Sequence, residues 1–288
     1  MTLDNNHQSE PKLSRDKISS SAEGHKKIAI IGGTGLTTLQ NLNILRREIV
    51  MTPYGEPSSS LAYGCIQQDC SSEEGSSEEG SKDTDNKEVV FIARHGHGHN
   101  IPPHMVNYRA NLWALKKVGI NVILAVNAVG GIREDMVPGS LLIPDQIIDY
   151  TTRRINTFFE KNLSHATHID FSYPYSTELS QQIIECAEKE HIDIIQGATY
   201  AATEGPRLET AAEIQRLKRD GCDIVGMTGM PEAALARELE MDYASICVNA
   251  NWAAGLSDGV ITMEAIEKNL QDGMAKVRQL IARFLSNQ

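Results

Sequence analysis

Runs of apolar residues recur along this chain, and their length and spacing predict which segments form strands and which form helices. Short runs rich in β-branched residues are typical of buried strands, and they occupy residues 26–31, 61–67, 89–93, 122–126, 193–199, 223–227 and 243–249. Two shorter apolar pieces, 141–143 and 147–149, flank Pro144. Longer stretches predict helices at residues 108–118, 178–190, 210–220, 231–239 and 262–285. Because strands alternate with helices, we predict an α/β fold around a mostly parallel sheet.

Two polar segments interrupt this pattern. Residues 1–26 have almost nothing to bury, so we predict a disordered tail before a domain that spans 27–288. Residues 68–88 contain the near-repeat SSEEG-SSEEG between two strand-like runs. We interpret this segment as an acidic loop inserted at a hairpin tip, where a long loop costs little closure entropy. A loop that docks a partner is the alternative interpretation.

Charge and cysteine content narrow the class of protein. The net charge of −11 argues against nucleic-acid binding, which needs a basic surface. More than half of that charge lies in residues 69–88, so it says little about other partners. We expect no membrane span, because no stretch approaches about 20 apolar residues. The N-terminus lacks a secretory signal, and the five cysteines form no C-x-x-C pattern, so we expect a cytoplasmic protein with reduced thiols.

The residues that follow the predicted strands carry the candidate chemistry. In parallel sheets, ligands bind outside the carboxyl ends of the strands. Glycines, hydroxyls, amides, one Arg and one His follow five strands, at residues 32–35, 94–96, 127–131, 228–229 and 249–255. The sequence therefore predicts a ligand site at this edge of the sheet.

Two of these segments are suited to anions. In GGTG, residues 32–35, closely spaced glycines let backbone N–H groups approach an anion, and Thr34 adds a donor. A tight turn or a dinucleotide site remains open, although Thr38 stands where the dinucleotide motif needs glycine and no P-loop lysine is present.

The segment RHGHGH, residues 94–99, offers the planar fork of Arg94 and a donor from His95. A metal site is an alternative, because histidines at alternate positions of a strand share a face. The intervening glycines argue against strand geometry, and no carboxylate partner lies nearby in the sequence. Histidines with a structural or surface role are the third interpretation.

Several ordered motifs resemble one known family. IIGGTG, FIARHGHGH, VNYRANLWALK, NAVGG, EGPRLET, and DIVGMTGMPEAALARE followed by YASI are similar to the methylthioadenosine phosphorylase branch of the trimeric purine nucleoside phosphorylases. The resemblance runs from about Ile28 to the C-terminal helix, and within the branch it is closest to the bacterial S-methyl-5′-thioinosine phosphorylases. It implies a single domain of the phosphorylase type, with a twisted, mixed and mostly parallel sheet flanked by helices.

The resemblance also implies roles for residues. Phosphate would be held by Thr34, Arg94, His95, the Asn127–Ala128 turn and Thr228. The family often has Thr at the position of Asn127, so the backbone N–H of Ala128 is the firmer contact there. Met227 would lie under the ribose. His168 matches a position that reaches the neighbouring subunit's site, which implies a homotrimer with shared sites.

Departures from the adenine-specific relatives point to a 6-oxopurine. Asn251 and Ala253 replace the two aspartates of a T-D-Y-D segment, with Trp252 between them. An amide both donates and accepts, which suits hypoxanthine or guanine. Glu209 follows Leu208 where adenine-specific relatives carry Ser, and a carboxylate accepts the N1–H that adenine lacks. The alternative role for Glu209 is that of an acid in the first turn of a helix.

Met263 points to the 5′ substituent. It stands where phosphorylases of ordinary inosine carry a His that binds the 5′-hydroxyl, and a thioether favours a methylthio group because burying an unpaired hydroxyl costs about 1–3 kcal/mol. Core packing is the alternative role for this methionine.

The expected reaction is displacement at C1′ of S-methyl-5′-thioinosine by phosphate, with Arg94, His95 and Asn251 as the catalytic residues. Such catalysis depends on positioning and electrostatics, so we expect no metal or organic cofactor, with phosphate as a substrate. The alternatives are an inosine or guanosine phosphorylase, a methylthioadenosine phosphorylase, a non-enzymatic binding protein, and a dinucleotide-dependent oxidoreductase using IIGGTGL.

Overall fold

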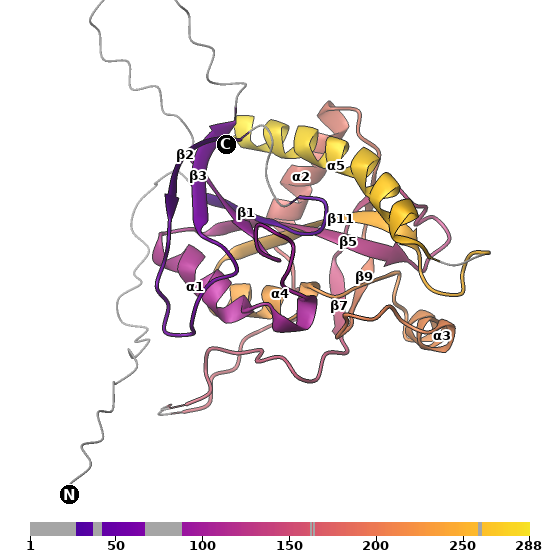
Figure 1. Cartoon of the computed structure of the whole chain (residues 1–288), viewed down its shortest axis with the longest axis horizontal. Coiled ribbons are helices and arrows are strands. Elements are labelled where there is room, and N and C mark those ends of the chain that lie inside the picture. Colours follow the sequence, from indigo (N-terminus) through magenta and orange to yellow (C-terminus); the bar gives the residue numbers. More distant parts are fainter. Residues whose placement is uncertain (1–26, 37–41, 67–87, 162, 164, 259–260) are drawn as a thin grey trace, which may run out of the picture.

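The computed structural model describes residues 27–36, 42–66, 88–161, 163, 165–258 and 261–288 (Figure 1). These residues form an 11-stranded sheet with five α-helices around it. The predicted tail, 1–26, and the predicted insertion, 68–88, lie outside the described residues except for Glu88. No described helix has the length and apolar character that crossing a bilayer requires.

Four buried strands form the centre of the sheet. They are β1 (Ile28–Gly32), β4 (Val89–Ala93), β5 (Val122–Gly131) and β11 (Asp242–Trp252). β1 lies between β4 and β5, and β11 lies along the other edge of β5, all in parallel. Near-continuous runs of Val, Ile and Ala allow both faces of these strands to be covered.

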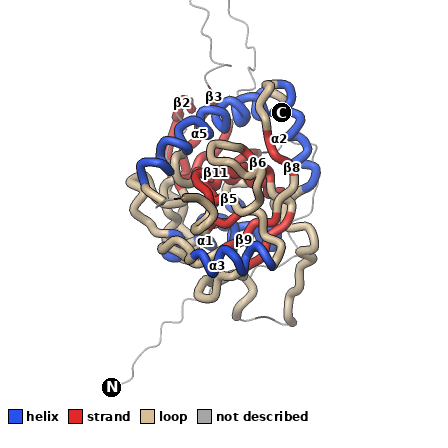
Figure 2. Tube along the Cα trace, turned by 90° about the vertical axis from the view of Figure 1, so that its right-hand side faces the viewer, coloured by secondary structure: helices blue, strands red, loops and turns tan. Residues whose placement is uncertain are grey.

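Alternate residues of β1 enter opposite hydrophobic cores. Ile28 and Ile30 face α2 (Thr177–Lys189) and α5 (Met263–Ser286). Ala29 and Ile31 face α1 (Tyr108–Lys117) and α4 (Gly229–Glu238). The period of two that defines a strand therefore places helices on both faces of the sheet (Figures 1 and 2).

A hairpin extends the sheet beyond β4. β3 (Leu61–Ile66) pairs antiparallel with β4 and with β2 (Leu42–Glu48). The antiparallel pairing of β3 and β4 confirms the predicted hairpin around the acidic segment. β2 was not predicted from the sequence, because its apolar residues, such as Ile44 and Leu45, are exposed on this edge strand and charged residues follow them.

Short strands complete the other part of the sheet, and the structure corrects one of them. They are β6 (Leu141–Ile143), β7 (Gln146–Asp149), β8 (Ile194–Gln196), β9 (Thr199–Ala202) and β10 (Ile224–Gly226). The single strand predicted at 193–199 is two strands, β8 and β9, because Gly197 between them has a positive φ of 74°. β8 pairs with β6, whereas β9 lies between β7 and β10.

The sheet is mixed, as the family resemblance implied. Six of the ten strand pairings in the described sheet are parallel, and four are antiparallel. The structure also extends β5 and β11 beyond their predicted ends at 126 and 249. The two strands continue as a parallel pair to Gly131 and Trp252, with a bulge between Asn249 and Asn251.

Two further helical segments lie near the carboxyl ends of the strands. α3 (Ala211–Arg219) starts at a capping box, in which the Thr210 side chain accepts from the Glu213 N–H and the Glu213 side chain accepts in return. A short 3₁₀ helix, η3 (Pro103–Met105), precedes α1. The structure thus confirms all five helices expected from the sequence, with small shifts at their ends.

Candidate active site

A cavity of about 550 Å³ opens at the carboxyl ends of the central strands. A volume of this size suits a small-molecule ligand. Eleven of the residues predicted for the site line it: Thr34, Arg94, His95, Ala128, Leu208, Glu209, Met227, Thr228, Asn251, Ala253 and Met263. Segments that follow or end β1, β4, β5, β10 and β11 therefore converge, as the sequence predicted.

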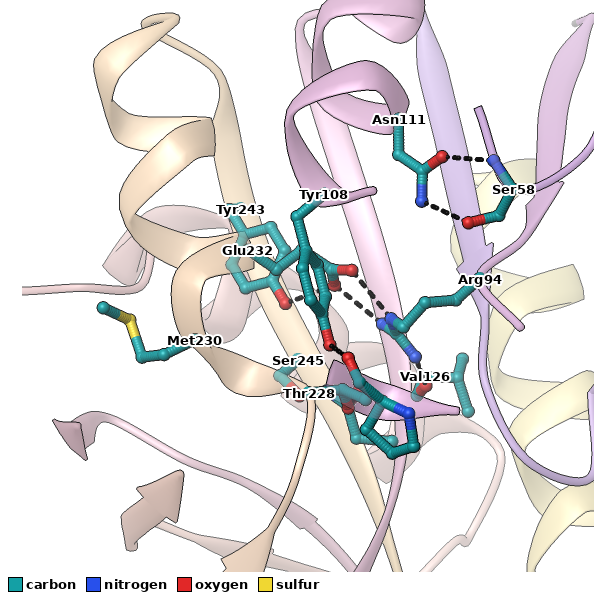
Figure 3. Close-up of polar contacts among 12 residues, drawn as sticks. Ser58, Arg94, Tyr108, Asn111, Val126, Thr228, Met230, Glu232, Tyr243 and Ser245 are labelled. Carbon is teal, nitrogen blue, oxygen red and sulfur yellow. Dashed lines mark hydrogen bonds and ion pairs between the residues drawn. The ribbon is translucent and has the colours of Figure 1, made fainter. Parts of the chain in front are cut away.

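Arg94 lines this cavity, and its side chain is fully buried. Its Nε and Nη2 atoms donate to the two carboxylate oxygens of Glu232, each at 2.7 Å, and Nη1 donates to the Val126 carbonyl at 2.9 Å (Figure 3). Burial lowers the pKa of Arg94, but the charge and hydrogen bonds of Glu232 outweigh burial and raise it above its ordinary value. Three of the five N–H groups are engaged, which leaves two for an anion in the cavity.

Glu232 is a residue that the sequence analysis missed. It lies in the first turn of α4, is fully buried, and also accepts a hydrogen bond from the Tyr243 hydroxyl at 2.9 Å (Figure 3). Burial raises the pKa of Tyr243 well above its ordinary value, so its hydroxyl stays protonated and donates. A lone acid in the apolar stretch MPEAALA was the available signal, because a buried carboxylate needs a cationic partner.

Gly33 supplies the space that Arg94 occupies. A Cβ atom at this position would lie 2.7 Å from Arg94 Nη1 and 2.5 Å from the Val126 carbonyl oxygen. Thr34, the next residue, lines the cavity. The glycine-rich turn therefore admits the guanidinium and places the Thr34 residue beside it.

His95 presents a hydrogen-bond acceptor rather than the predicted donor. Its Nδ1 lies 2.8 Å from the Ile101 carbonyl oxygen, and because a carbonyl only accepts, Nδ1 carries the proton. Burial, helped by the Arg94 charge, lowers the pKa of His95 to about 4. At neutral pH the ring is uncharged, so Nε2 holds a lone pair that suits a protonated phosphate oxygen.

The pKa of His95 predicts a loss of stability in acid. Between pH 6.5 and 4 the unfolded chain binds a proton at this ring that the folded protein excludes, so the free energy of unfolding falls as the pH falls. The expected contribution is up to about 3 kcal/mol. Urea unfolding of His95→Gln in phosphate-free buffer should show a correspondingly flatter pH dependence. The exposed His97→Gln serves as control, and equal slopes for the two variants would contradict the prediction.

The three histidines of RHGHGH do not share a strand face. β4 ends at Ala93, and residues 94–99 follow in turns. His97 is exposed with Nε2 3.4 Å from Arg47 Nη1, whereas the His99 ring packs edge-on against His95 at 5.0 Å between centroids. Within the described part of the chain, no three His, Cys, Asp or Glu side chains converge on a common point where a metal ion could bind.

Asn127 supports Thr228 from behind the cavity. Its side chain is buried, accepts from Thr228 Oγ1 at 2.8 Å and donates to Ser245 Oγ at 2.6 Å. The side chain therefore does not line the cavity, which corrects its expected direct contact with phosphate. Ala128, the next residue, does line it. Asn127 orients the hydroxyl of Thr228, and the alternation of β5 brings Ala128 to the ligand side.

Glu209 and Asn251 also line the cavity. Glu209 Oε1 accepts from Thr203 Oγ1 at 2.7 Å. The helix acid at the start of α3 is Glu213, which forms the capping box, so the alternative role of Glu209 as a first-turn acid does not apply. Asn251 donates one N–H to the Trp252 carbonyl at 2.7 Å, which leaves the other N–H and the amide oxygen for a ligand.

Two predicted substrate residues lie outside the cavity. Trp252 does not line it, because successive side chains of β11 point to opposite faces and the bulge turns Asn251 toward the ligand side. His168 is exposed on the long segment between β7 and α2, away from the cavity lining of its own chain. Its predicted contact with a neighbouring subunit stays a prediction.

The two predicted methionines, Met227 and Met263, both line the cavity. Met227 follows β10, and the backbone of Gly205, with a positive φ of 61°, lies directly against its side chain. Met263 begins α5 beside the apolar cavity residues Ile261 and Ile266, and 64% of it is exposed. The alternative that Met263 is a core residue is therefore wrong.

Arg154 is a second residue that the sequence analysis missed. Its side chain is 3% exposed and donates to the carbonyls of Met227 (2.6 Å), Met230 (2.5 Å), Thr203 (3.2 Å) and Glu204 (2.8 Å). It also contacts the Glu204 carboxylate at 3.3 Å. Arg154 thus joins the chain after β9, which leads to Glu209, to the chain after β10, which carries Met227 and Thr228.

Two known proteins are similar to this chain over most of its length. A protein of Pseudomonas syringae pv. tomato named "Probable S-methyl-5′-thioinosine phosphorylase" is 53% identical over 258 residues, which cover 90% of this chain and 98% of its own. A Thermococcus kodakarensis protein named "Probable 6-oxopurine nucleoside phosphorylase" is 39% identical over 264 residues, covering 90% and 91%.

Solved structures show the same architecture. The methylthioadenosine phosphorylase of Schistosoma mansoni in complex with adenine superposes with a TM-score of 0.81 at 30% identity, over 91% of this chain and 92% of that one. A methylthioadenosine phosphorylase from an antarctic soil metagenomic library gives a TM-score of 0.78 at 33% identity, over 91% and 86%. The model of the phosphorylase superfamily matches residues 27–286, and the chain therefore belongs to that superfamily.

Proposed function

We propose that this protein cleaves S-methyl-5′-thioinosine with inorganic phosphate to give hypoxanthine and 5-methylthioribose 1-phosphate, as a pentosyltransferase of purine salvage. One observation carries the proposal: the same cavity is lined by two residues that can donate to an anion, Arg94 and Thr34, and by two polar residues that can bind a purine base, Glu209 and Asn251. The name of the 53% identical Pseudomonas protein supports the same substrate.

The phosphate-binding residues and the base-binding residues have different roles in the reaction. Phosphate, held by the N–H groups of Arg94 and the hydroxyl of Thr34, attacks C1′ as the C1′–N9 bond breaks and its electron pair moves onto the purine. The proton of hydrogen phosphate ends on the released base, so atoms and charge balance. Asn251 donates its free N–H to N7 or O6, where negative charge develops. Catalysis comes from fixed positions and prearranged charge, with no cofactor in any step.

Base selectivity follows from the chemistry of the Glu209 carboxylate. A carboxylate accepts the N1–H of hypoxanthine, whereas the bare N1 of adenine would face it with a lone pair. Asn251 can donate its one free N–H to either O6 or N7. The methylthio preference is supported by Met263 and the apolar Ile261 and Ile266 around it. Ordinary 6-oxopurine nucleosides are the second candidate substrates, and the name of the Thermococcus relative favours them.

We also propose that the protein acts in the cytoplasm as a homotrimer with sites completed by neighbours. Met263, which lines the cavity and is exposed, and His168, which is exposed on its loop, support this arrangement, because a neighbouring subunit could cover both. Sedimentation of the purified protein tests it, and a monomer with full activity would contradict it.

Phosphate-dependent base release from methylthioinosine, methylthioadenosine and inosine tests the proposed substrate. We expect methylthioinosine to have the highest kcat/KM, because only this nucleoside satisfies Glu209 and Met263 together. Fastest cleavage of methylthioadenosine would overturn the roles of Glu209 and Asn251, and equal rates with inosine would overturn that of Met263. No release from any of the three would overturn the proposed function.

Exchanging the two base-contacting residues should move the preference toward adenine. In Glu209→Ser with Asn251→Asp, we expect the ratio of kcat/KM for methylthioinosine over methylthioadenosine to fall by at least about tenfold, because the N1–H loses its acceptor and N7 gains a carboxyl partner. Phosphate KM is the internal control, since neither residue lies at the Arg94 end. An unchanged ratio would remove both residues from base recognition.

A further inference from the structure

Thr203 follows β9 and directs its hydroxyl at the carboxylate of Glu209. The Oγ1–Oε1 distance is 2.7 Å, whereas the Gly226 carbonyl, the other acceptor near this hydroxyl, lies at 3.4 Å. A threonine hydroxyl has one proton to donate, and a charged acceptor at the shorter distance takes it. The hydroxyl is therefore committed to Glu209.

The backbone of Thr203 is fixed on both sides. Its N–H donates to the Gly226 carbonyl at 2.8 Å, and its own carbonyl accepts from Arg154 Nη2 at 3.2 Å. Gly226 ends β10, the strand that leads directly to Met227 and Thr228. The position of the Thr203 hydroxyl is thus coupled to the phosphate and ribose part of the cavity.

Glu209, in contrast, has little else to hold it. It lies just before the N-cap of α3, outside the helix, and its half-buried side chain has several rotatable bonds. Among the described residues, Thr203 makes the only hydrogen bond to its carboxylate. Without that bond, the carboxylate would sample several rotamers and would meet the base in the productive one only part of the time.

We propose that Thr203 is a positioning residue for substrate specificity, which holds Oε1 of Glu209 so that Oε2 faces the N1–H of a 6-oxopurine. This inference rests on the proposed function of the cavity. Thr203 does not line the cavity itself, so it acts through Glu209 and touches neither substrate.

Thr203→Val tests the inference, because it removes the hydroxyl and keeps the shape of the side chain. We expect kcat/KM for methylthioinosine to fall about tenfold to hundredfold, as for loss of a hydrogen bond to a charged group, with little change for methylthioadenosine. Thr203→Ser, which keeps the hydroxyl, should show the wild-type ratio of kcat/KM for methylthioinosine over kcat/KM for methylthioadenosine. Thr199→Val, a matched change on β9 away from the cavity, should leave the ratio unaltered.

A second measurement separates positioning from a general structural role. In a Glu209→Gln background, Thr203→Val should have an effect on the ratio at least severalfold smaller than in wild type, because the charged acceptor is gone. Equal loss for both nucleosides, or the same effect in both backgrounds, would overturn the inference. A wild-type protein without 6-oxopurine preference would overturn the proposed function as well, whereas a preference that survives Thr203→Val overturns the role of Thr203 alone.

Discussion

Glu232→Leu is expected to lower the free energy of unfolding by about 3–5 kcal/mol, the range for removing one partner of a buried ion pair. The guanidinium of Arg94 would remain charged in a site with no solvent exposure, with only the Val126 carbonyl as acceptor. Arg94→Met should destabilise comparably, because it leaves the Glu232 carboxylate buried beside Tyr243. Urea unfolding of both variants measures the effect.

Removing both charges together separates stability from activity. The double variant, Arg94→Met with Glu232→Leu, should recover much of the lost stability, since apolar side chains of similar volume replace the pair. Adding Tyr243→Phe removes the hydroxyl that would be left without its acceptor. Phosphorolysis should stay about 10²–10³-fold below wild type in every variant that lacks Arg94, because the cavity loses its cationic donor.

These variants distinguish the structural role of the Arg94–Glu232 ion pair from the role of Arg94 in phosphate binding. A double variant as unstable as the single ones would show that the pair stabilises the fold by more than mutual neutralisation. Wild-type phosphate KM in any variant without Arg94 would remove this residue from phosphate binding. The change in phosphate KM does not depend on the change in stability, so either of the two predictions can fail alone.

Arg154→Met is expected to lower the free energy of unfolding by about 3 kcal/mol or more. It should also weaken the binding of both phosphate and nucleoside. The carbonyls of Met227, Met230, Thr203 and Glu204 would lose a charged donor, and each buried acceptor left unpaired costs about 1–3 kcal/mol. Since these carbonyls belong to the two segments that carry Thr228 and Glu209, the KM values for phosphate and nucleoside should rise together.

Arg153→Met is the matched control, because the neighbouring Arg153 is exposed and contacts Glu204 only through its backbone N–H. We expect its stability and kinetics to stay near those of wild type. Arg154→Lys is informative too, since a single ammonium cannot reach four carbonyls in the geometry of a guanidinium fork. If Arg154→Met matched Arg153→Met in both measurements, Arg154 would not organise the cavity.

The sequence alone determined the features that depend on local patterns. Buried apolar runs located β1, β3 and β4, and helical spacing located all five helices. Both signals depend only on residues that are close together in the sequence. The rule that ligands bind at the carboxyl ends of strands then selected residues such as Arg94, Thr228 and Asn251 before any contact was known. Family motifs supplied Glu209 and Met263.

Tertiary structure decided which of these groups touch the cavity and what holds them there. Glu232 lies 138 residues from Arg94, and Arg154 about 50 residues from Thr203, so no local pattern connects these partners. The edge strand β2 exposes apolar residues such as Ile44 and Leu45, so no buried apolar run marked it in the sequence. Asn127 turned away from the ligand, and Met263 faced it, because strand register and the start of α5 set their directions. Local periodicity placed the elements, whereas long-range pairing of buried charge and backbone groups decided the site.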